Sequence, residues 1–145
     1  MAKWPDVPAV YGWLELDRRG QWRIKGERIQ HRGLREFIAR NYRADAQGRW
    51  YFQNGPQRVF VTLAYTPLVA RYEGEALVDH CDRPIIPRAT YLDDEGSVLV
   101  EGGVAVALLD DRDLERYADQ GERLRRIDQA DVERRFSFVR EPSPL

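Results

Sequence analysis

The chain has 145 residues, of which 43% are hydrophobic and 32% are charged, and it contains four Trp. These proportions are those of a folded globular protein, and they exclude a disordered or fibrous chain. The formal net charge is only −1, but it conceals a charge of +7 over residues 1–72 and of −8 over residues 73–145.

Cys81 is the single cysteine, so the chain cannot form an internal disulfide, and a reducing compartment suits it. No apolar stretch of the kind found in a signal peptide follows the N-terminus. The longest clean apolar run, residues 104–109, is far too short to span a bilayer. We therefore expect a cytoplasmic protein.

A short turn signature occurs three times along the chain. Each copy has the pattern Asp-x-x-Gly and is followed by alternating apolar residues; the copies start at Asp17, Asp45 and Asp93. The Asp side chain can accept hydrogen bonds from its own turn, and Gly can adopt a positive φ. Each copy therefore predicts a tight turn that leads into a half-buried strand.

In chain order, the first copy joins strands predicted at 10–16 and 21–25. The apolar spacing then becomes helical over residues 32–43, which predicts an amphipathic helix with Arg35, Arg40 and Arg43 on its outer surface. The second copy leads into a strand at 50–53, which Asn54-Gly55 turns into another at 58–64.

The second part of the chain repeats this kind of pattern. Strands are predicted at 68–72 and 76–80, and a connector with two prolines follows at 83–87. The third copy joins strands at 89–92 and 97–101, and a strand at 104–109 leads into a helix that Asp110 or Asp111 can cap. Leu114, Tyr117, Ala118 and Gly121 form its predicted inner stripe, and Gly121 can instead end it, before a second helical piece near 128–134.

These elements predict an α+β fold made of two small antiparallel β-sheet units, each with one main helix. The shared turn signature suggests an internal duplication. We expect a basic N-terminal unit at 1–82, an acidic C-terminal unit with a helix at 83–127, and a partly flexible extension at 128–145. The opposite charges indicate that the halves dock on each other, bind an acidic partner or nucleic acid, or self-associate head to tail.

Several of these segments resemble a family of uncharacterised bacterial proteins. The resemblance covers about residues 20–118 and rests on 20–29, 45–52 and 58–67 in the first half, and on Pro84-Ile85, 91–101 and 102–109 in the second. It implies a duplicated α+β protein whose C-terminal unit is superficially like a pleckstrin-homology fold, with a ligand surface between the units. It implies no catalytic residues. The chain departs from the family in the very short link between the strand at 68–72 and Ala76.

The segment Asp79-His80-Cys81-Asp82 places an imidazole, a thiol and two carboxylates together. Neighbouring residues of a strand point to opposite faces, so His80 is poorly placed to activate Cys81. His31 precedes the first helix and suits a capping role better than that of a general base. The chain has no second Cys for a zinc site and no phosphate-binding loop around Gly102-Gly103. We therefore assign no catalytic residue, no metal ligand and no cofactor.

A cluster of arginines and aromatic residues is the strongest binding candidate. Arg side chains bind carboxylates and phosphates in a two-point manner, and aromatic rings can stack on bases. The alternative interpretation is that the rings belong to the core and that the arginines form a solvated face. The candidate ligand-binding residues are Arg35, Arg40, Arg43, Arg49, Trp50, Tyr51 and Arg58.

The sequence leads to three hypotheses about the function of the protein. The first is a non-enzymatic binding or regulatory module that recognises a peptide, a protein or a small acidic ligand between its units, with homo-oligomer formation as a further option. The second is nucleic-acid binding by the arginine-rich N-terminal half. The third, a hydrolase or transferase, requires His31, His80 and Cys81 to converge.

Overall fold

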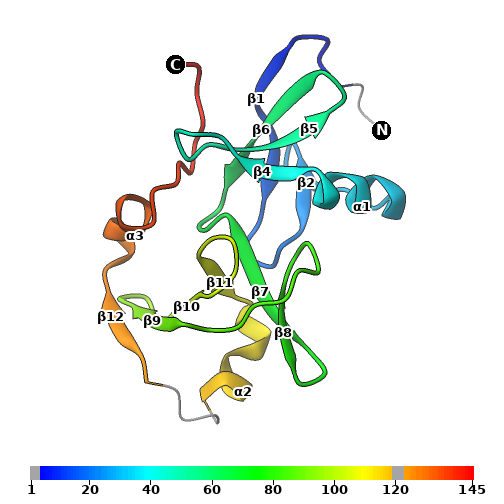
Figure 1. Ribbon diagram of the computed structural model, residues 1–145. Coiled ribbons are helices and arrows are strands. Elements are labelled where there is room, and N and C mark those ends of the chain that lie inside the picture. Colours follow the sequence, from blue (N-terminus) through cyan, green and yellow to red (C-terminus); the bar gives the residue numbers. More distant parts are fainter. Residues whose placement is uncertain (1–3, 119–122) are drawn as a thin grey trace.

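The computed structural model describes residues 4–118 and 123–145 and contains two six-stranded mixed β-sheets (Figure 1). The first sheet has the order β3-β2-β1-β6-β5-β4, and α1 packs against it. Its elements are β1 (Ala9–Leu16), β2 (Trp22–Ile24), β3 (Glu27–Arg28), α1 (Arg32–Arg40), β4 (Tyr42–Ala44), β5 (Trp50–Asn54) and β6 (Gln57–Leu63).

The second sheet has the order β12-β9-β10-β11-β7-β8. Its strands are β7 (Leu68–Glu73), β8 (Ala76–Asp79), β9 (Ala89–Asp93), β10 (Val98–Glu101), β11 (Ala107–Leu109) and β12 (Arg125–Ile127). The short helices of this half are η1 (Asp111–Asp113), α2 (Leu114–Ala118) and α3 (Gln129–Arg135). The α+β class and the two sheet units predicted from the sequence are confirmed.

The antiparallel hairpins that the sequence predicted are joined by parallel pairs, so each of the two sheets is mixed. β1 lies parallel to β6, β7 lies parallel to β11, and β12 lies parallel to β9. A parallel pair needs a long crossover connection, and turn signatures describe only neighbouring antiparallel strands. The sequence pattern therefore identified the hairpins but not these long-range pairings.

The two sheets repeat one arrangement of strands. Without β3 and β12, the first sheet reads β2-β1-β6-β5-β4 and the second reads β8-β7-β11-β10-β9. In both, a hairpin is followed by a three-stranded meander whose last strand pairs in parallel with the first strand of the hairpin. The Asp45 and Asp93 turns occupy equivalent places in the two meanders. This shared topology is consistent with duplication.

The chain changes sheet at residues 64–67, upstream of the boundary after Asp82 that the proline connector suggested. Residues 68–79, which sequence analysis grouped with the N-terminal unit, pair in the second sheet. The buried apolar residues of both sheets form one continuous core cluster. Two buried tyrosines link the halves: Tyr42 donates from its hydroxyl to the Pro67 carbonyl at 2.7 Å, and Tyr65 donates to Asp93 Oδ2 at 2.9 Å.

The predicted helix at 32–43 is shorter than expected, because α1 ends at Arg40. Asn41 caps its C-terminal end and donates from Nδ2 to the Phe37 carbonyl. Tyr42 then begins β4, which pairs with β5. Pairing with β5 thus ends the helix before Arg43 and places Arg43 on a strand. In the second half, Gly121 lies outside the described residues.

The C-terminal segment returns to the first sheet, as the red end of the chain shows in Figure 1. The Val139 amide donates to the Gly48 carbonyl, and the Leu63 amide donates to the Arg140 carbonyl. Phe138 and Pro142 are buried. Much of the extension that the sequence suggested to be flexible is therefore packed against the protein. None of the helices in 4–118 and 123–145 has both the length and the apolar character needed to cross a membrane.

Candidate functional site

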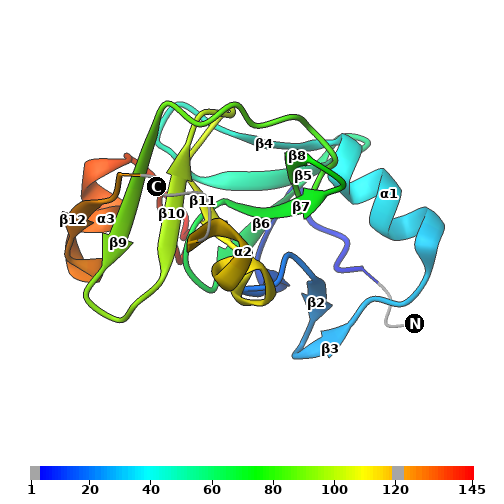
Figure 2. The same ribbon diagram turned by 90° about the horizontal axis from the view of Figure 1, so that it is seen from below.

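A pocket of about 480 Å³ lies where the two halves of the molecule meet. One wall comes from α1, β3 and the start of β2, and the other comes from β7 and the turn after β8. Figure 2 labels these helices and strands. We call this cavity the junction pocket. It is lined by Gly20, Gln21, Trp22, Arg28, Ile29, Arg32, Arg35, Glu36, Ala39, Arg40, Arg71, His80, Cys81 and Asp82.

The turn after β8 is a fourth copy of the signature that organises the hairpins. Asp79 Oδ1 accepts hydrogen bonds from the amides of Cys81 at 2.8 Å and Arg83 at 3.1 Å, and Asp79 Oδ2 pairs with Arg83 Nε at 2.9 Å. The Asp45 turn has the same pattern of contacts, with Arg49 in the place of Arg83.

Sequence analysis missed this fourth copy because Asp82 stands where the other copies have Gly. Asp82 has a φ of +64°, close to the +78° of Gly20 and Gly48. Asp is one of the few residues that tolerate this left-handed conformation. A pattern of Asp-x-x-Asp would have revealed the turn. The segment that suggested catalysis is thus a tight turn that presents His80, Cys81 and Asp82 to the junction pocket.

Among the described residues, five arginines line the junction pocket, and three of them have no partner there. Arg32 pairs with Glu36 at 2.9 Å, and Arg71 pairs with Asp82 at 2.5 Å. Over residues 4–118 and 123–145, the side chains of Arg28, Arg35 and Arg40 make no hydrogen bond or ion pair. The two carboxylates in the lining are already paired, so they leave these three positive charges uncompensated.

Arg35 is distinctive within this group because its Nε atom is shielded from solvent. That atom has no hydrogen-bond acceptor among the described residues. A buried donor without an acceptor costs about 1–3 kcal/mol, and more when it carries charge. Arg35 thus places an unsatisfied donor and an uncompensated charge on the α1 wall of the junction pocket.

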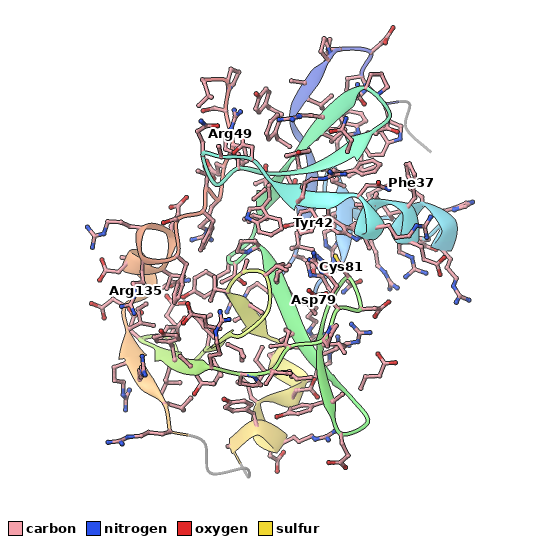
Figure 3. The ribbon with its side chains drawn as sticks, viewed as in Figure 1. Phe37, Tyr42, Arg49, Asp79, Cys81 and Arg135 are labelled. Carbon is pink, nitrogen blue, oxygen red and sulfur yellow. The ribbon has the colours of Figure 1, made fainter. Side chains whose placement is uncertain are left out.

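His80 and Cys81 line the junction pocket, and Cys81 is labelled below Tyr42 in Figure 3. His80 Nδ1 accepts a hydrogen bond from the Val69 amide at 3.2 Å, so the neutral ring carries its proton on Nε2. Nε2 is buried and has no partner among the described residues. The ring packs against Trp22 and Tyr42, and this burial lowers the pKa of His80 to about 3. His80 is therefore a neutral hydrogen-bond donor near pH 7.

The Cys81 thiol is protonated near pH 7, because burial raises its pKa to about 12. His31 lies elsewhere: its Nδ1 accepts from the Leu34 amide at 3.1 Å and caps α1. In the described part of the chain, no hydrogen bond connects His31, His80 and Cys81. No group of three or more His, Cys, Asp or Glu residues suited to a metal ion is found in 4–118 and 123–145.

The predicted cluster of arginines and aromatic residues divides between two places. Arg35 and Arg40 line the junction pocket. Arg43 and Tyr51 are cross-strand partners, and Tyr51 in turn pairs with Phe60, so these side chains share the face of the first sheet opposite to that of Phe52. Arg58 lies over the Tyr51 ring at 4.5 Å. The strand alternation that separates these faces could not bring all seven predicted residues together.

Arg49 and Trp50 have structural surroundings. Arg49 is buried, pairs with Asp45 at 2.8 Å and donates to the Ser143 carbonyl at 2.8 Å. Its guanidinium lies over the Phe60 ring at 4.4 Å. Trp50 is 6% exposed and Tyr51 is 5% exposed, so neither ring offers an open face for stacking bases.

The sequence did not indicate that Arg28, Arg32, Arg71 and His80 would line one pocket. They come from β3, α1, β7 and the turn after β8. The charge of +7 over residues 1–72 was a signal for the arginines. Nothing local in the sequence indicated that Arg71 and His80 would face α1, because that contact depends on how the two sheets pack.

A family model named DUF2944, with the description "Protein of unknown function (DUF2946)", matches residues 1–143. The chain belongs to the DUF2944 family. The expectation of an uncharacterised family is thereby confirmed, and family membership assigns no specific function.

Two solved structures share the fold of this DUF2944 protein. A DUF1285 family protein from Silicibacter pomeroyi DSS-3 superposes with a TM-score of 0.57 and 15% sequence identity, over 77% of this chain and 69% of that one. A DUF1285 family protein from Shewanella baltica OS155 superposes with a TM-score of 0.54 and 13% identity, over 74% of this chain and 91% of that one. No curated protein matches the sequence.

Proposed function

We propose that this protein is a binding module that holds a small anionic ligand in the junction pocket. The main observation in its favour is that three arginines around one pocket, Arg28, Arg35 and Arg40, have no partners in the described part of the chain. Uncompensated charges that share a concave site repel one another, and their repulsion is relieved when an anion enters. The pocket volume of about 480 Å³ lies within the usual range for small-molecule sites.

The position of the pocket supports a regulatory role for the ligand. Arg28, Arg35 and Arg40 come from the first half, whereas His80 and Asp82 come from the second. A ligand that contacts both walls stabilises the packing of one half on the other. Ligand at 100 times its Kd stabilises the folded protein by about 2.7 kcal/mol.

The proposed module acts without catalysis and in the cytoplasm. The neutral His80, the protonated Cys81 thiol and the separate position of His31 support a site that binds without transforming its ligand. Cys81 is a free thiol, which suits a reducing compartment.

The test is a thermal-unfolding screen with small carboxylates and phosphates at constant ionic strength. We expect at least one anion to raise the Tm of the wild-type protein and to lose most of this effect in Arg35→Gln. Arg125→Gln removes the same charge from an exposed position on β12, outside the junction pocket, and should respond like wild type. Unfolding of both variants without ligand checks that they fold.

Two results would contradict the proposal. The first is that no anion stabilises the wild-type protein. The second is stabilisation that Arg35→Gln and Arg125→Gln retain equally. Binding of a single-stranded oligonucleotide and of an acidic peptide is also measured at low salt. If this binding is retained in Arg35→Gln but lost in Arg43→Glu/Arg58→Glu, the partner binds the outer face of the first sheet instead.

A further inference from the structure

We infer that the anion in the junction pocket is the phosphate group of a small organic phosphate monoester, bound by Arg28, Arg35 and Arg40. This inference rests on the proposed function and adds the chemical class of the ligand. The number of arginines in the lining, the pairing of its carboxylates and the apolar residues of the cavity point to this class.

The number of guanidinium groups without partners among the described residues fits a phosphate. A carboxylate has two oxygens and one charge, and a single arginine fork satisfies it. A phosphate monoester has three terminal oxygens and a charge of about −1.5 to −2 at pH 7. Three arginines without internal partners therefore suit a phosphate much better than a single carboxylate.

The three arginines come from two neighbouring elements of the fold. Residues 32, 35, 36, 39 and 40 of α1 line the pocket, and their spacing places them along one side of the helix. Arg28 comes from β3, which shares this wall of the pocket with α1. Donors thus come from two elements, as an anion with several oxygens in different directions requires.

The acidic residues that line the junction pocket already have arginine partners. Glu36 is paired with Arg32, and Asp82 is paired with Arg71. These ion pairs use the two carboxylates and two of the five arginines. The remaining lining charge is that of Arg28, Arg35 and Arg40, which a dianion offsets more completely than a monoanion does.

The junction pocket also has lining residues for the part of the ligand beyond the phosphate. Trp22, Ile29 and Ala39 supply apolar lining, and His80 carries a buried Nε2–H with no partner among the described residues. Free phosphate would fill only a fraction of about 480 Å³. An organic group against the apolar lining, with an oxygen that accepts from His80, uses the rest of the site.

The experiment follows the arginine side-chain ¹⁵Nε–¹Hε signals by NMR during titration. The probes are inorganic phosphate, glucose 6-phosphate, glucose and the dicarboxylate succinate, all at equal ionic strength. We expect both phosphates to shift the Arg35 signal, and to do so at concentrations about tenfold lower than succinate, because phosphate engages more arginine donors. Glucose alone should leave the signal unchanged.

Two variants make the result specific. Arg40→Gln should weaken phosphate binding about tenfold or more, as measured by the shift of the Arg35 signal. Arg125→Gln has the same change in charge and should bind within about twofold of wild type. Vesicles that contain phosphatidic acid carry the same phosphate monoester on a lipid; sedimentation with them that depends on Arg40 would show that the phosphate is a lipid headgroup.

The outcomes separate this inference from the proposed function. If succinate shifts the Arg35 signal at concentrations equal to or lower than the phosphates do, the phosphate inference is overturned and the anion site remains. If inorganic phosphate binds and glucose 6-phosphate does not, the inference that the ligand is an organic phosphate ester is overturned. If no probe shifts any arginine signal, and the thermal screen also finds no stabilising anion, both proposals fail.

Discussion

At the scale of single residues, His80 shows how one side chain serves both stability and the site. Its Nδ1 is fixed by the Val69 amide, its ring packs against Trp22 and Tyr42, and its buried Nε2–H has no partner among the described residues. A charged imidazolium would lose both the accepted hydrogen bond and its hydration. The fold therefore holds His80 neutral.

This constraint predicts a pH dependence of the free energy of unfolding. The pKa of His80 is about 3 when folded, below the ordinary value of 6.5, so the unfolded chain binds a proton first as the pH falls. The wild-type protein should lose about 2 kcal/mol between pH 7 and pH 5 through this group alone. In His80→Asn, the side-chain oxygen can still accept from Val69 but does not titrate.

Urea unfolding at both pH values measures the effect. The wild-type protein should lose more stability than His80→Asn over this interval, by about 2 kcal/mol. Equal losses in the two proteins would show that His80 is not held neutral by the fold.

At the scale of elements, the Asp-x-x-Gly turn is the unit that the sequence predicted best. Asp17, Asp45 and Asp93 each accept two backbone amides, as local turn chemistry requires. Prediction was less successful where a contact is long-range. The parallel pairing of β1 with β6, the end of α1 at Arg40 and the meeting of Arg71 with α1 all depend on segments far apart in the chain.

The same limit applies to the candidate site. Arg35 and Arg40 were predicted because helical spacing places them on an outer surface, and they line the junction pocket. Arg49 has the same chemistry in the sequence, yet the C-terminal segment covers it and Ser143 accepts its hydrogen bond. Whether an arginine is free or buried is decided by tertiary packing, which residue type and local spacing do not encode.

Two glycines of equivalent turns provide a matched test of this packing. Gly48 and Gly96 have φ values of +78° and +85°. An added Cβ at Gly48 would lie 2.2 Å from the Ser137 carbonyl oxygen, whereas nothing lies within 4 Å of one at Gly96. Gly96→Ala should therefore cost about 1 kcal/mol from backbone strain, and Gly48→Ala about 3 kcal/mol or more.

Chemical denaturation of the two variants checks this difference. Gly48→Ala should also release the C-terminal segment, because the Gly48 carbonyl accepts from the Val139 amide. Faster proteolysis after residue 135 in Gly48→Ala alone would show that the C-terminal segment is released in this variant. Similar losses of stability in both variants would mean that the segment does not pack against Gly48.

At the scale of the whole molecule, the two sheets form one cooperative body. Their apolar residues belong to one core cluster, and Tyr42 and Tyr65 make buried hydrogen bonds across the change of sheet. Arg19 and Asp111 add an ion pair of 2.9 Å between the halves at the surface. The chain thus contains two sheets but one core.

A single unfolding transition is the expected consequence. The calorimetric enthalpy of unfolding should equal the van't Hoff enthalpy, since neither half can lose its packing without exposing the core of the other. Differential scanning calorimetry measures both quantities. Two resolved transitions, or a calorimetric enthalpy well above the van't Hoff value, would contradict a shared core.

The repeated strand order has a consequence for where the arginines of the junction pocket come from. The segment between β2 and β4 contains α1, and the equivalent segment between β8 and β9 contains the Asp79 turn; both line the pocket. If both segments formed an arginine-rich helix, two sets of positive charges would lie close together across the junction and repel each other. The difference between these two equivalent segments lets one half supply most of the arginines while the other half contributes a compact turn.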